Sequence, residues 1–236
     1  MHARFKLYAM DERINYPEIE EFLRSVIKRE EGFLSQLEKY AEERFIPIVQ
    51  PETAALLKVI VGIHKPERVL EAGTAIGYSA CVIARAMGSS GIVDTIEIDE
   101  EMAEAARKNI ETMGLGSRIR VLQGDALEVM ECLSTPYDLI FLDAAKGQYL
   151  EYFEQAMRLL KPGGLLISDN ILYKGLVLQD RKAMHKHRTI AAKLNEYLHV
   201  LCHDDRLETA VIPIGDGLAI SLKKQVQGRQ YGGVNE

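Results

Sequence analysis

Apolar residues near the start of the chain recur at the spacing of a helical face. One apolar stripe predicts a helix over Pro17 to Arg29, and a second predicts a helix over Phe33 to Arg44. Pro51, a residue type favoured at the first helical position, opens a third apolar stretch that runs to His64. Such apolar faces must be buried, either against the rest of the chain or against a second copy of it.

From residue 68 onward, short apolar strands alternate with helices. We expect strands at 68–73, 91–99, 118–125, 137–143 and 164–170, and helices at 77–87, 100–113, 149–160 and 179–201. The sequence Lys-Pro-Gly-Gly is expected to stop the third of these helices. Repeated strand–helix units predict an α/β fold with a doubly wound, mostly parallel sheet. Residues 207–224 contain two apolar runs joined by Ile-Gly-Asp-Gly, which predicts an antiparallel hairpin at one edge of the sheet.

The domain organisation follows from this order of elements. We expect one domain over residues 1–224, in which residues 1–66 act as a cover over the active-site side or as a dimer surface. Residues 225–236 are polar and glycine-rich and are expected to form a flexible tail. The chain has 236 residues, of which 47% are hydrophobic, so it can bury a sizeable core.

Charge and cysteine content argue against several classes of protein. The 29 Lys and Arg residues against 35 Asp and Glu give a formal charge of −6, which disfavours a general electrostatic grip on nucleic acid but not a local basic patch. Three scattered cysteines without a CxxC motif argue against a disulfide framework or a zinc site. No apolar run approaches the ~18 residues of a membrane span. We therefore expect a soluble, cytoplasmic protein with no membrane association.

Acidic residues end four consecutive predicted strands at the edge where open α/β sheets bind ligands. These residues are Glu71, Glu97, Asp125 and Asp143. Gly73 and Gly77 allow a tight loop after the first strand, although Ala75 breaks the GxGxxG pattern. Glu97 is placed to accept hydrogen bonds from ribose hydroxyls, and Glu71 would repel a diphosphate. A nucleoside with positive charge fits this edge, and S-adenosylmethionine has the required amino group, sulfonium and ribose diol.

Structural roles are the alternative for the same residues. The glycines would then serve turns only, and Asp125 would be a helix N-cap. A dinucleotide-binding Rossmann module is a second alternative, against which the missing GxGxxG and the acid at Glu71 both argue. Four acids at one edge favour the nucleoside site over a purely structural explanation.

A second acidic group follows from the crossover between two neighbouring strands. A right-handed crossover places the strands that end in Asp143 and Asp169 side by side, with their carboxyl ends at the same edge. Asp143, Asp169 and Asn170 then converge, and two carboxylates with an amide oxygen suit Mg²⁺. Lys146 is expected one helical turn after Asp143, within reach of a substrate oxygen. The alternative is that the aspartates cap helices and that Lys146 is a solvated surface residue.

Five motifs occur in the order of a known family. LEAGTAIGYSA, IEIDEE, GDA, FLDAAKGQY and SDNIL resemble the cation-dependent class I O-methyltransferases of the catechol and caffeoyl-CoA type. The resemblance runs from about Ile46 to Lys223 and includes IPIGDGLAIS. Through IPIV, DAAKGQY and DNILYKGLV, the chain looks most similar to the bacterial branch that includes tRNA 5-hydroxyuridine methyltransferases.

The resemblance implies roles for the matched residues. Those implied to surround S-adenosylmethionine are Val49, Glu71, Gly73, Ser79, Glu97, Asp125, Ala126 and Asp143. Asp143, Asp169 and Asn170 are implied to bind Mg²⁺ or another divalent cation, and Lys146 is implied to be the general base. A homodimer is implied as well, because related enzymes often pair.

The acceptor for such chemistry must offer two adjacent oxygens. A catechol does so, and so does 5-hydroxyuridine. Residues 180–193 form a basic segment on an acidic chain, and its candidates for tRNA contacts are Arg181, Lys182, Lys186 and Arg188. A solvated helix face is the alternative for this segment. We therefore expect formation of 5-methoxyuridine in tRNA, with small catechols or caffeoyl-CoA-like phenolics as the alternative acceptors.

Overall fold

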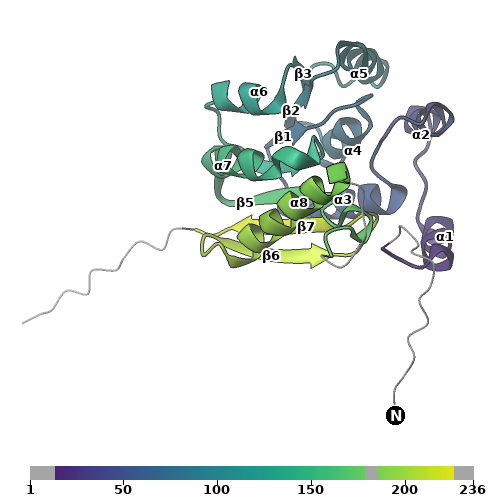
Figure 1. Ribbon diagram of the computed structural model, residues 1–236. Helices are drawn as coiled ribbons and strands as arrows, with labels where there is room; N and C mark the ends of the chain where they lie inside the picture. Colours follow the sequence, from purple (N-terminus) through teal and green to yellow (C-terminus); the bar gives the residue numbers. More distant parts are fainter. Residues whose placement is uncertain (1–13, 179–184, 226–236) are drawn as a thin grey trace, which may run out of the picture.

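A seven-stranded sheet forms the centre of the protein in the computed structural model, which describes residues 14–178 and 185–225. Its strand order is β3-β2-β1-β4-β5-β7-β6 (Figure 1). The bounds are β1 (Arg68–Ala72), β2 (Ile92–Glu97), β3 (Ile119–Gln123), β4 (Tyr137–Leu142), β5 (Leu160–Asp169), β6 (Leu207–Ile212) and β7 (Leu218–Lys223). Strands β1 to β5 pair in parallel, while β7 pairs antiparallel with both β5 and β6. The predicted α/β fold and its closing hairpin are confirmed.

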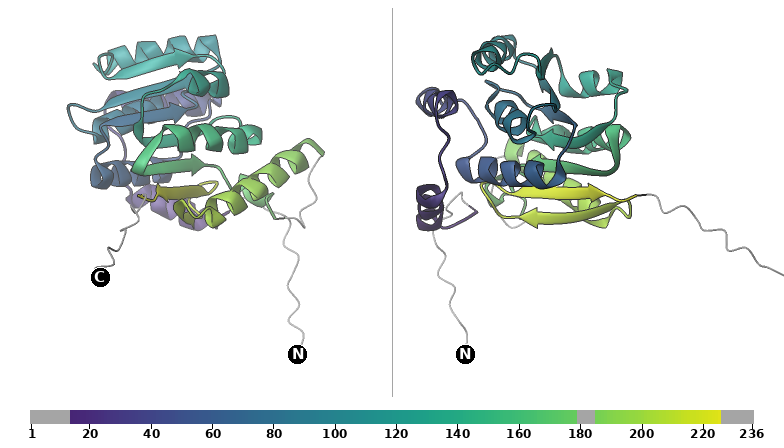
Figure 2. Two further views of the ribbon diagram at one scale, coloured as in Figure 1. Left: turned by 90° about the vertical axis from the view of Figure 1, so that its left-hand side faces the viewer. Right: turned by 180° about the vertical axis from the view of Figure 1, so that it is seen from behind.

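Helices cover both faces of the sheet. They are α1 (Pro17–Val26), α2 (Phe33–Arg44), α3 (Pro51–His64), α4 (Tyr78–Ala86), α5 (Glu100–Thr112), α6 (Ala126–Cys132), α7 (Tyr149–Leu159) and α8 (His185–His203), with short 3-10 turns η1 (Lys146–Gln148) and η2 (Tyr173–Gly175). Helices α6, α7 and α8 pack on the face toward the viewer in Figure 1, and α3, α4 and α5 lie behind it, as the right-hand view of Figure 2 shows. Strand β4, inside the sheet, is therefore buried along almost its whole length, in keeping with its apolar sequence, whereas the edge strand β3 exposes Arg120 and Gln123.

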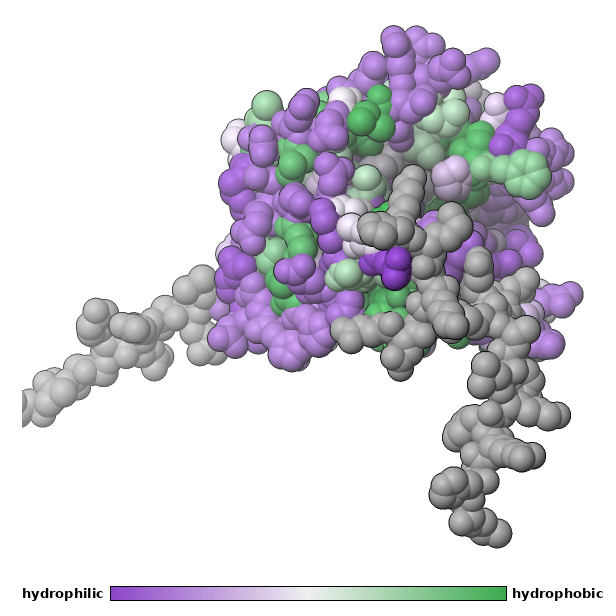
Figure 3. Space-filling view, in the orientation of Figure 1, coloured by the Kyte–Doolittle hydropathy of each residue, from purple (hydrophilic) through white to green (hydrophobic). Residues whose placement is uncertain are grey.

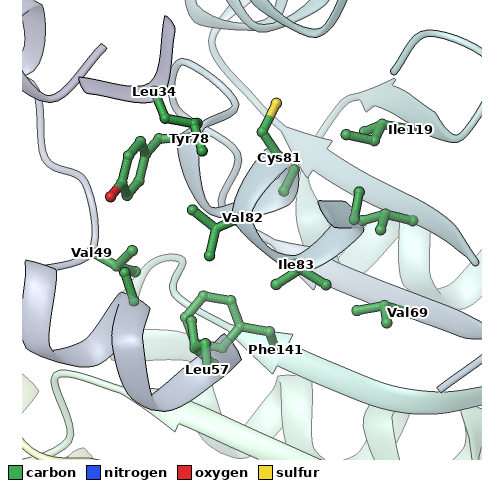
Figure 4. Close-up of a cluster of buried hydrophobic side chains, with 14 of the residues drawn as sticks. Leu34, Val49, Leu57, Val69, Tyr78, Cys81, Val82, Ile83, Ile119 and Phe141 are labelled. Atoms are coloured by element: carbon green, nitrogen blue, oxygen red, sulfur yellow. The ribbon is translucent and has the colours of Figure 1, made fainter. Parts of the chain in front are cut away.

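Alternate residues of each strand supply two separate cores. In β4, Phe141 packs with α3 and α4, whereas Ile140 packs with α6 and α7 on the opposite face. Figure 4 shows the first of these clusters, in which Leu57 and Ile83 lie over Phe141. The hydroxyl of Tyr78 donates a hydrogen bond to Glu38 at 2.5 Å, so α2 is tied to the same cluster.

The beginning of β5 differs from the sequence prediction. Lys-Pro-Gly-Gly was expected to separate a helix from a strand, but β5 already begins at Leu160. Leu160 pairs with Tyr137, and a register shift between Tyr137 and Leu139 accommodates the proline. A Cβ at Gly164 would lie 2.9 Å from the Asp138 carbonyl oxygen, so a glycine permits this close approach.

Helix α1 ends at Val26 rather than at Arg29 and buries none of its residues. Ile19, Phe22 and Val26 are more than half exposed. Among its contacts, Arg24 forms two hydrogen bonds to the carboxylate of Glu52, at 2.9 and 3.1 Å. A dimer surface in residues 1–66 remains a prediction.

The outer surface is mainly polar. Figure 3 shows polar residues over most of the face in view, with apolar residues in small separate groups. In the part of the chain that the structure describes, none of the helices has both the length and the apolar character of a membrane span.

Candidate active site

A cavity of about 990 Å³ lies at the carboxyl ends of the parallel strands. Loops that follow β1 to β5 form its floor, and α2 with residues 46–51 forms another wall. The predicted site residues that line it are Val49, Gly73, Ser79, Glu97, Asp125, Ala126, Asp143, Lys146, Asp169 and Asn170. One cavity therefore contains both the predicted nucleoside side and the predicted cation side.

The loop after β1 depends on one glycine and on Glu97. Gly73 has φ +100°, and a Cβ there would lie 2.2 Å from the carbonyl oxygen of Asp143. Ala75 is also left-handed, with φ 45°, and its amide donates to Glu97 Oε2 at 2.7 Å. The other oxygen of Glu97 accepts from the amide of Asp99 at 2.9 Å. Glu97 thus stabilises the loop after β1. Ala75 of this loop stands where the GxGxxG pattern has its second glycine.

Glu71 lies deeper than the sequence indicated. It was expected to line the methionine end of the cavity, but its side chain is fully buried in β1, with its neighbours β2 and β4 on either side. Thr95 donates to its Oε2 at 2.5 Å, and its Oε1 has no hydrogen-bond partner. Burial raises the pKa of Glu71 to about 7, against the opposing effect of the Ser79 and Thr95 hydroxyls. A buried carboxylate with an unpaired oxygen is suited to a cationic group.

Asp125 serves as a helix cap and also faces the cavity. Its Oδ1 accepts from the amides of Leu127 at 2.9 Å and Glu128 at 3.3 Å, at the start of α6. The predicted N-cap role of this residue is therefore confirmed. Asp125 and Ala126 nevertheless line the cavity beside the loop of Glu97, so the cap orients a residue of the site.

The two acidic strand ends come together as predicted. Asp143 follows β4 and Asp169 ends β5, and the preceding residues Leu142 and Ser168 pair across the two strands. Burial raises the pKa of both carboxyls above the ordinary value, and the charge of Asp143 contributes to the rise at Asp169. Asn170 follows with a left-handed φ of 55°.

The donor set suits a hard divalent cation. A nearby positive charge would stabilise the ionised form of these two carboxylates, whose pKa values are raised. An amide oxygen from Asn170 would complete a set of oxygen ligands. Within the described residues, no group of three His, Cys, Asp or Glu side chains is arranged to hold a metal ion.

Lys146 has the expected neighbours but a different backbone. The prediction of one helical turn between Asp143 and Lys146 is wrong, because β4 ends at Leu142 and the first helical residue is Lys146 itself, at the start of η1. The ammonium group still interacts electrostatically with Asp143 and Asp169 and lowers the pKa of both carboxyls.

Asp216 does not line the cavity but supports one of its loops, and the sequence analysis missed this role. It lies in the turn between β6 and β7, and its Oδ1 accepts from the amide of Lys174 at 2.5 Å. The amide of Leu172 donates to the Asp216 carbonyl at 3.0 Å, and that of Ile171 donates to the Gly217 carbonyl at 3.1 Å. This turn therefore anchors the loop that follows Asn170. Ile-Gly-Asp-Gly was the available signal, but it was interpreted as a hairpin turn only.

The basic segment is described in part. Arg181 and Lys182, together with the side chain of Lys186, lie outside the described residues, while Arg188 is exposed on α8 and does not line the cavity. Helix α8 nevertheless adjoins the cation side. A hydrogen bond of 2.7 Å joins His187 to the Tyr173 hydroxyl, and Lys193 donates to the Gly147 carbonyl at 2.8 Å.

Comparison with known proteins agrees with this geometry. A family profile described as O-methyltransferase matches residues 24–224. The chain is 32% identical to a catechol O-methyltransferase of Mycobacterium tuberculosis, over 90% of this chain and 98% of that protein.

Solved structures agree in fold and in sequence. A putative caffeoyl-CoA O-methyltransferase from Staphylococcus aureus is 33% identical, with a TM-score of 0.80 over 87% of this chain and 99% of that one. An O-methyltransferase from Bacillus cereus, solved in complex with SAH, is 27% identical, with a TM-score of 0.78 over 88% of this chain and 97% of that one. The chain therefore belongs to the O-methyltransferase family.

Proposed function

We propose that the protein transfers a methyl group from S-adenosylmethionine to one of two adjacent oxygens on a small aromatic acceptor, with the help of a divalent cation. One observation carries this proposal. Asp143, Asp169, Asn170 and Lys146 line the same cavity as Glu97 and the glycine loop. The predicted nucleoside site and the predicted cation site thus share one space, as a methyl transfer from a nucleoside donor to a chelated oxygen requires.

The cofactor side uses the residues around the first two strands. S-adenosylmethionine supplies the methyl group when it is bound. Each carboxylate oxygen of Glu97 already accepts one backbone hydrogen bond, and the carboxylate would also accept hydrogen bonds from the ribose diol. Asp125 and Ala126 would flank the base. Glu71, with its unpaired oxygen, would attract the amino group of the methionine part from below the cavity floor.

The acceptor side uses the two strand ends. Asp143, Asp169 and Asn170 would hold the cation, and a bound cation would lower the pKa of the acceptor hydroxyl. Lys146 would take the proton from that hydroxyl at Nζ.

Small phenolic acceptors are favoured by the relatives. Several proteins to which the chain is similar carry the names catechol O-methyltransferase and caffeoyl-CoA O-methyltransferase, the latter in one case as putative. The cavity of about 990 Å³ is of the size usual for sites that take small ligands, with room for a nucleoside beside one aromatic ring.

5-Hydroxyuridine in tRNA is the second candidate acceptor. The observation that favours it is the contact of α8 with the cation side through His187 and Lys193, because α8 carries the exposed Arg188 and continues the basic segment. A phosphate backbone lying along this helix would bring a base toward Lys146.

A labelled-methyl assay tests both candidates. Methyl-labelled S-adenosylmethionine and Mg²⁺ are offered with a catechol, with caffeoyl-CoA, or with tRNA that bears 5-hydroxyuridine. The enzymes are wild type, Asp169→Ala and, as a control, Asp205→Ala, which removes an exposed carboxylate away from the cavity. We expect label in a small phenolic, lost only in Asp169→Ala. Label in tRNA alone would identify 5-hydroxyuridine in tRNA as the acceptor instead. Activity of Asp169→Ala equal to that of wild type would refute the cation site.

A further inference from the structure

One buried hydroxyl links the two strand ends that carry the proposed cation ligands. The Tyr149 hydroxyl lies 3.2 Å from the carbonyl oxygen of Leu142 and 3.0 Å from the carbonyl oxygen of Asp169. Leu142 ends β4 directly before Asp143, and Asp169 ends β5. A phenol has a single proton to donate, so the two carbonyls share it as a three-centre hydrogen bond.

Backbone pairing between β4 and β5 does not fix the distance between Asp143 and Asp169. The last pair between β4 and β5 is Leu142 with Ser168, so Asp143 and Asp169 lie one position beyond it. The amide of Asp143 donates to the Ala72 carbonyl of β1 at 2.8 Å, while Asp169 pairs with Leu218 of β7. The two ligand residues are thus held by strands on opposite sides, and the Tyr149 hydroxyl bridges between them.

Tyr149 is itself firmly placed. It is 1% exposed, and its ring meets that of Tyr197 edge to face, with centroids 5.3 Å apart. Tyr197 in turn shares a hydrogen bond of 2.6 Å with the Ser168 hydroxyl. Burial, together with the nearby carboxylates of Asp143 and Asp169, raises the pKa of Tyr149 well above its ordinary value. The phenol therefore keeps its proton and remains a donor at all ordinary pH values.

We propose that Tyr149 is a positioning residue that sets the separation of Asp143 and Asp169 and thereby the cation affinity of the site. This inference rests on the cation site of the proposed function. Without the hydroxyl, two buried carbonyl oxygens lose a shared donor and repel each other, so the strand ends move apart. Removal of a group that hydrogen-bonds to a metal ligand and orients it typically weakens metal binding by 10-fold or more.

The test measures Mn²⁺ binding to the protein without S-adenosylmethionine, through the loss of the electron paramagnetic resonance signal of the free ion. Tyr149→Phe removes the hydroxyl and keeps the ring packing. We expect it to weaken Mn²⁺ binding roughly 10-fold, while the dissociation constant for S-adenosylmethionine stays at the wild-type value. Higher Mn²⁺ concentrations should restore most of the lost kcat/KM.

A matched control separates positioning from general stability. Tyr137→Phe also removes a buried hydroxyl, which donates to Asp94 at 2.7 Å; Tyr137 begins β4, at the opposite end of the strand from the cavity, and neither residue lines the cavity. It should lower the melting temperature without changing Mn²⁺ affinity. The proposal is overturned if Tyr149→Phe binds Mn²⁺ like wild type, or if both tyrosine variants weaken binding equally.

A second variant reports on the cation site itself. Asp169→Ala should abolish Mn²⁺ binding. If it binds Mn²⁺ as well as wild type does, then both the cation site and the role of Tyr149 are refuted. If Asp169→Ala fails to bind while Tyr149→Phe binds normally, the cation site stands and only the role of Tyr149 is refuted.

Discussion

The carboxylate of Asp216 accepts a hydrogen bond from the backbone amide of Lys174 at 2.5 Å. This contact connects the turn of the β6–β7 hairpin to the loop that follows Asn170. Tyr173 and Lys174 have left-handed φ values of 46° and 55°, a conformation that is unfavourable for residues other than glycine. The loop therefore needs external anchors, and the hairpin turn supplies them.

Loss of the Asp216 carboxylate should impair acceptor turnover. Asp216→Ala removes the acceptor of the Lys174 amide, a hydrogen bond to a charged group worth about 1.5–3 kcal/mol, so we expect kcat/KM for the acceptor to fall roughly tenfold or more. Asp216→Asn retains an oxygen acceptor and should recover part of the loss. S-Adenosylmethionine affinity, measured by calorimetry, should not change. Wild-type kinetics in Asp216→Ala would show that the loop holds its shape without this anchor.

Gly73→Ala should abolish cofactor binding. Its Cβ would meet the Asp143 carbonyl oxygen at 2.2 Å, and φ +100° is strained for alanine. The matched control is Gly62→Ala in α3, where nothing lies within 4 Å, and helix propensity predicts a gain of about 0.5–1 kcal/mol. Thermal unfolding and S-adenosylmethionine titration measure both effects. Normal cofactor binding by Gly73→Ala would contradict the close approach of the two loops.

Glu71 should make stability fall as pH rises in the absence of cofactor. Its pKa is raised from 4.5 to about 7 in the folded state, so between these values the folded protein binds the proton more tightly than the unfolded chain does. The free energy of unfolding should therefore decrease by roughly 2–3 kcal/mol between pH 5 and pH 8. The melting temperature should fall between pH 5 and pH 8, and this fall should be larger for wild type than for Glu71→Gln. A parallel fall in both proteins would contradict the raised pKa.

Ionisation of Glu71 lowers the stability of the folded protein but should raise its affinity for the cofactor. The amino group of S-adenosylmethionine is attracted to the ionised form of Glu71, so affinity should rise as pH rises through about 7. Glu71→Gln should bind more weakly and should lose most of this pH dependence. Calorimetric titrations between pH 6 and pH 8 measure it.

Asp94 should be important for stability and unimportant for binding. It is 1% exposed and accepts from Arg68 at 3.0 Å, Arg120 at 2.9 Å and the Tyr137 hydroxyl at 2.7 Å. Asp94→Ala leaves these partners without their acceptor and should destabilise the protein by about 3 kcal/mol. Urea unfolding provides the measurement.

An exposed ion pair provides the control for Asp94. Glu208 lies 3.5 Å from Lys224 at the surface, so Glu208→Ala should change the free energy of unfolding by less than about 1 kcal/mol. Cofactor affinity should be the same in both variants. Equal effects of the two substitutions on stability would contradict the importance of the buried network.

Local patterns determined the order of the elements and the edge at which the site lies. The apolar run of β4 and the helical stripe of α2 depend on neighbouring residues only, and both elements occur where they were predicted. The adjacency of Asp143 and Asp169 was also predictable, because the handedness of a strand–helix–strand connection leaves one arrangement.

Tertiary contacts decided the features that no local pattern contains. Whether Lys-Pro-Gly-Gly ends a helix or continues a strand depended on pairing with Tyr137, which lies in another strand. Asp216 reaches the loop after Asn170 only because β7 pairs with β5, and the depth of Glu71 depends on the strands on either side of it. The sequence thus determined which chemical groups are present and on which edge, since periodicity and connection rules are local. Their depth, their anchors and the separation of the acids came from packing between segments far apart in the chain.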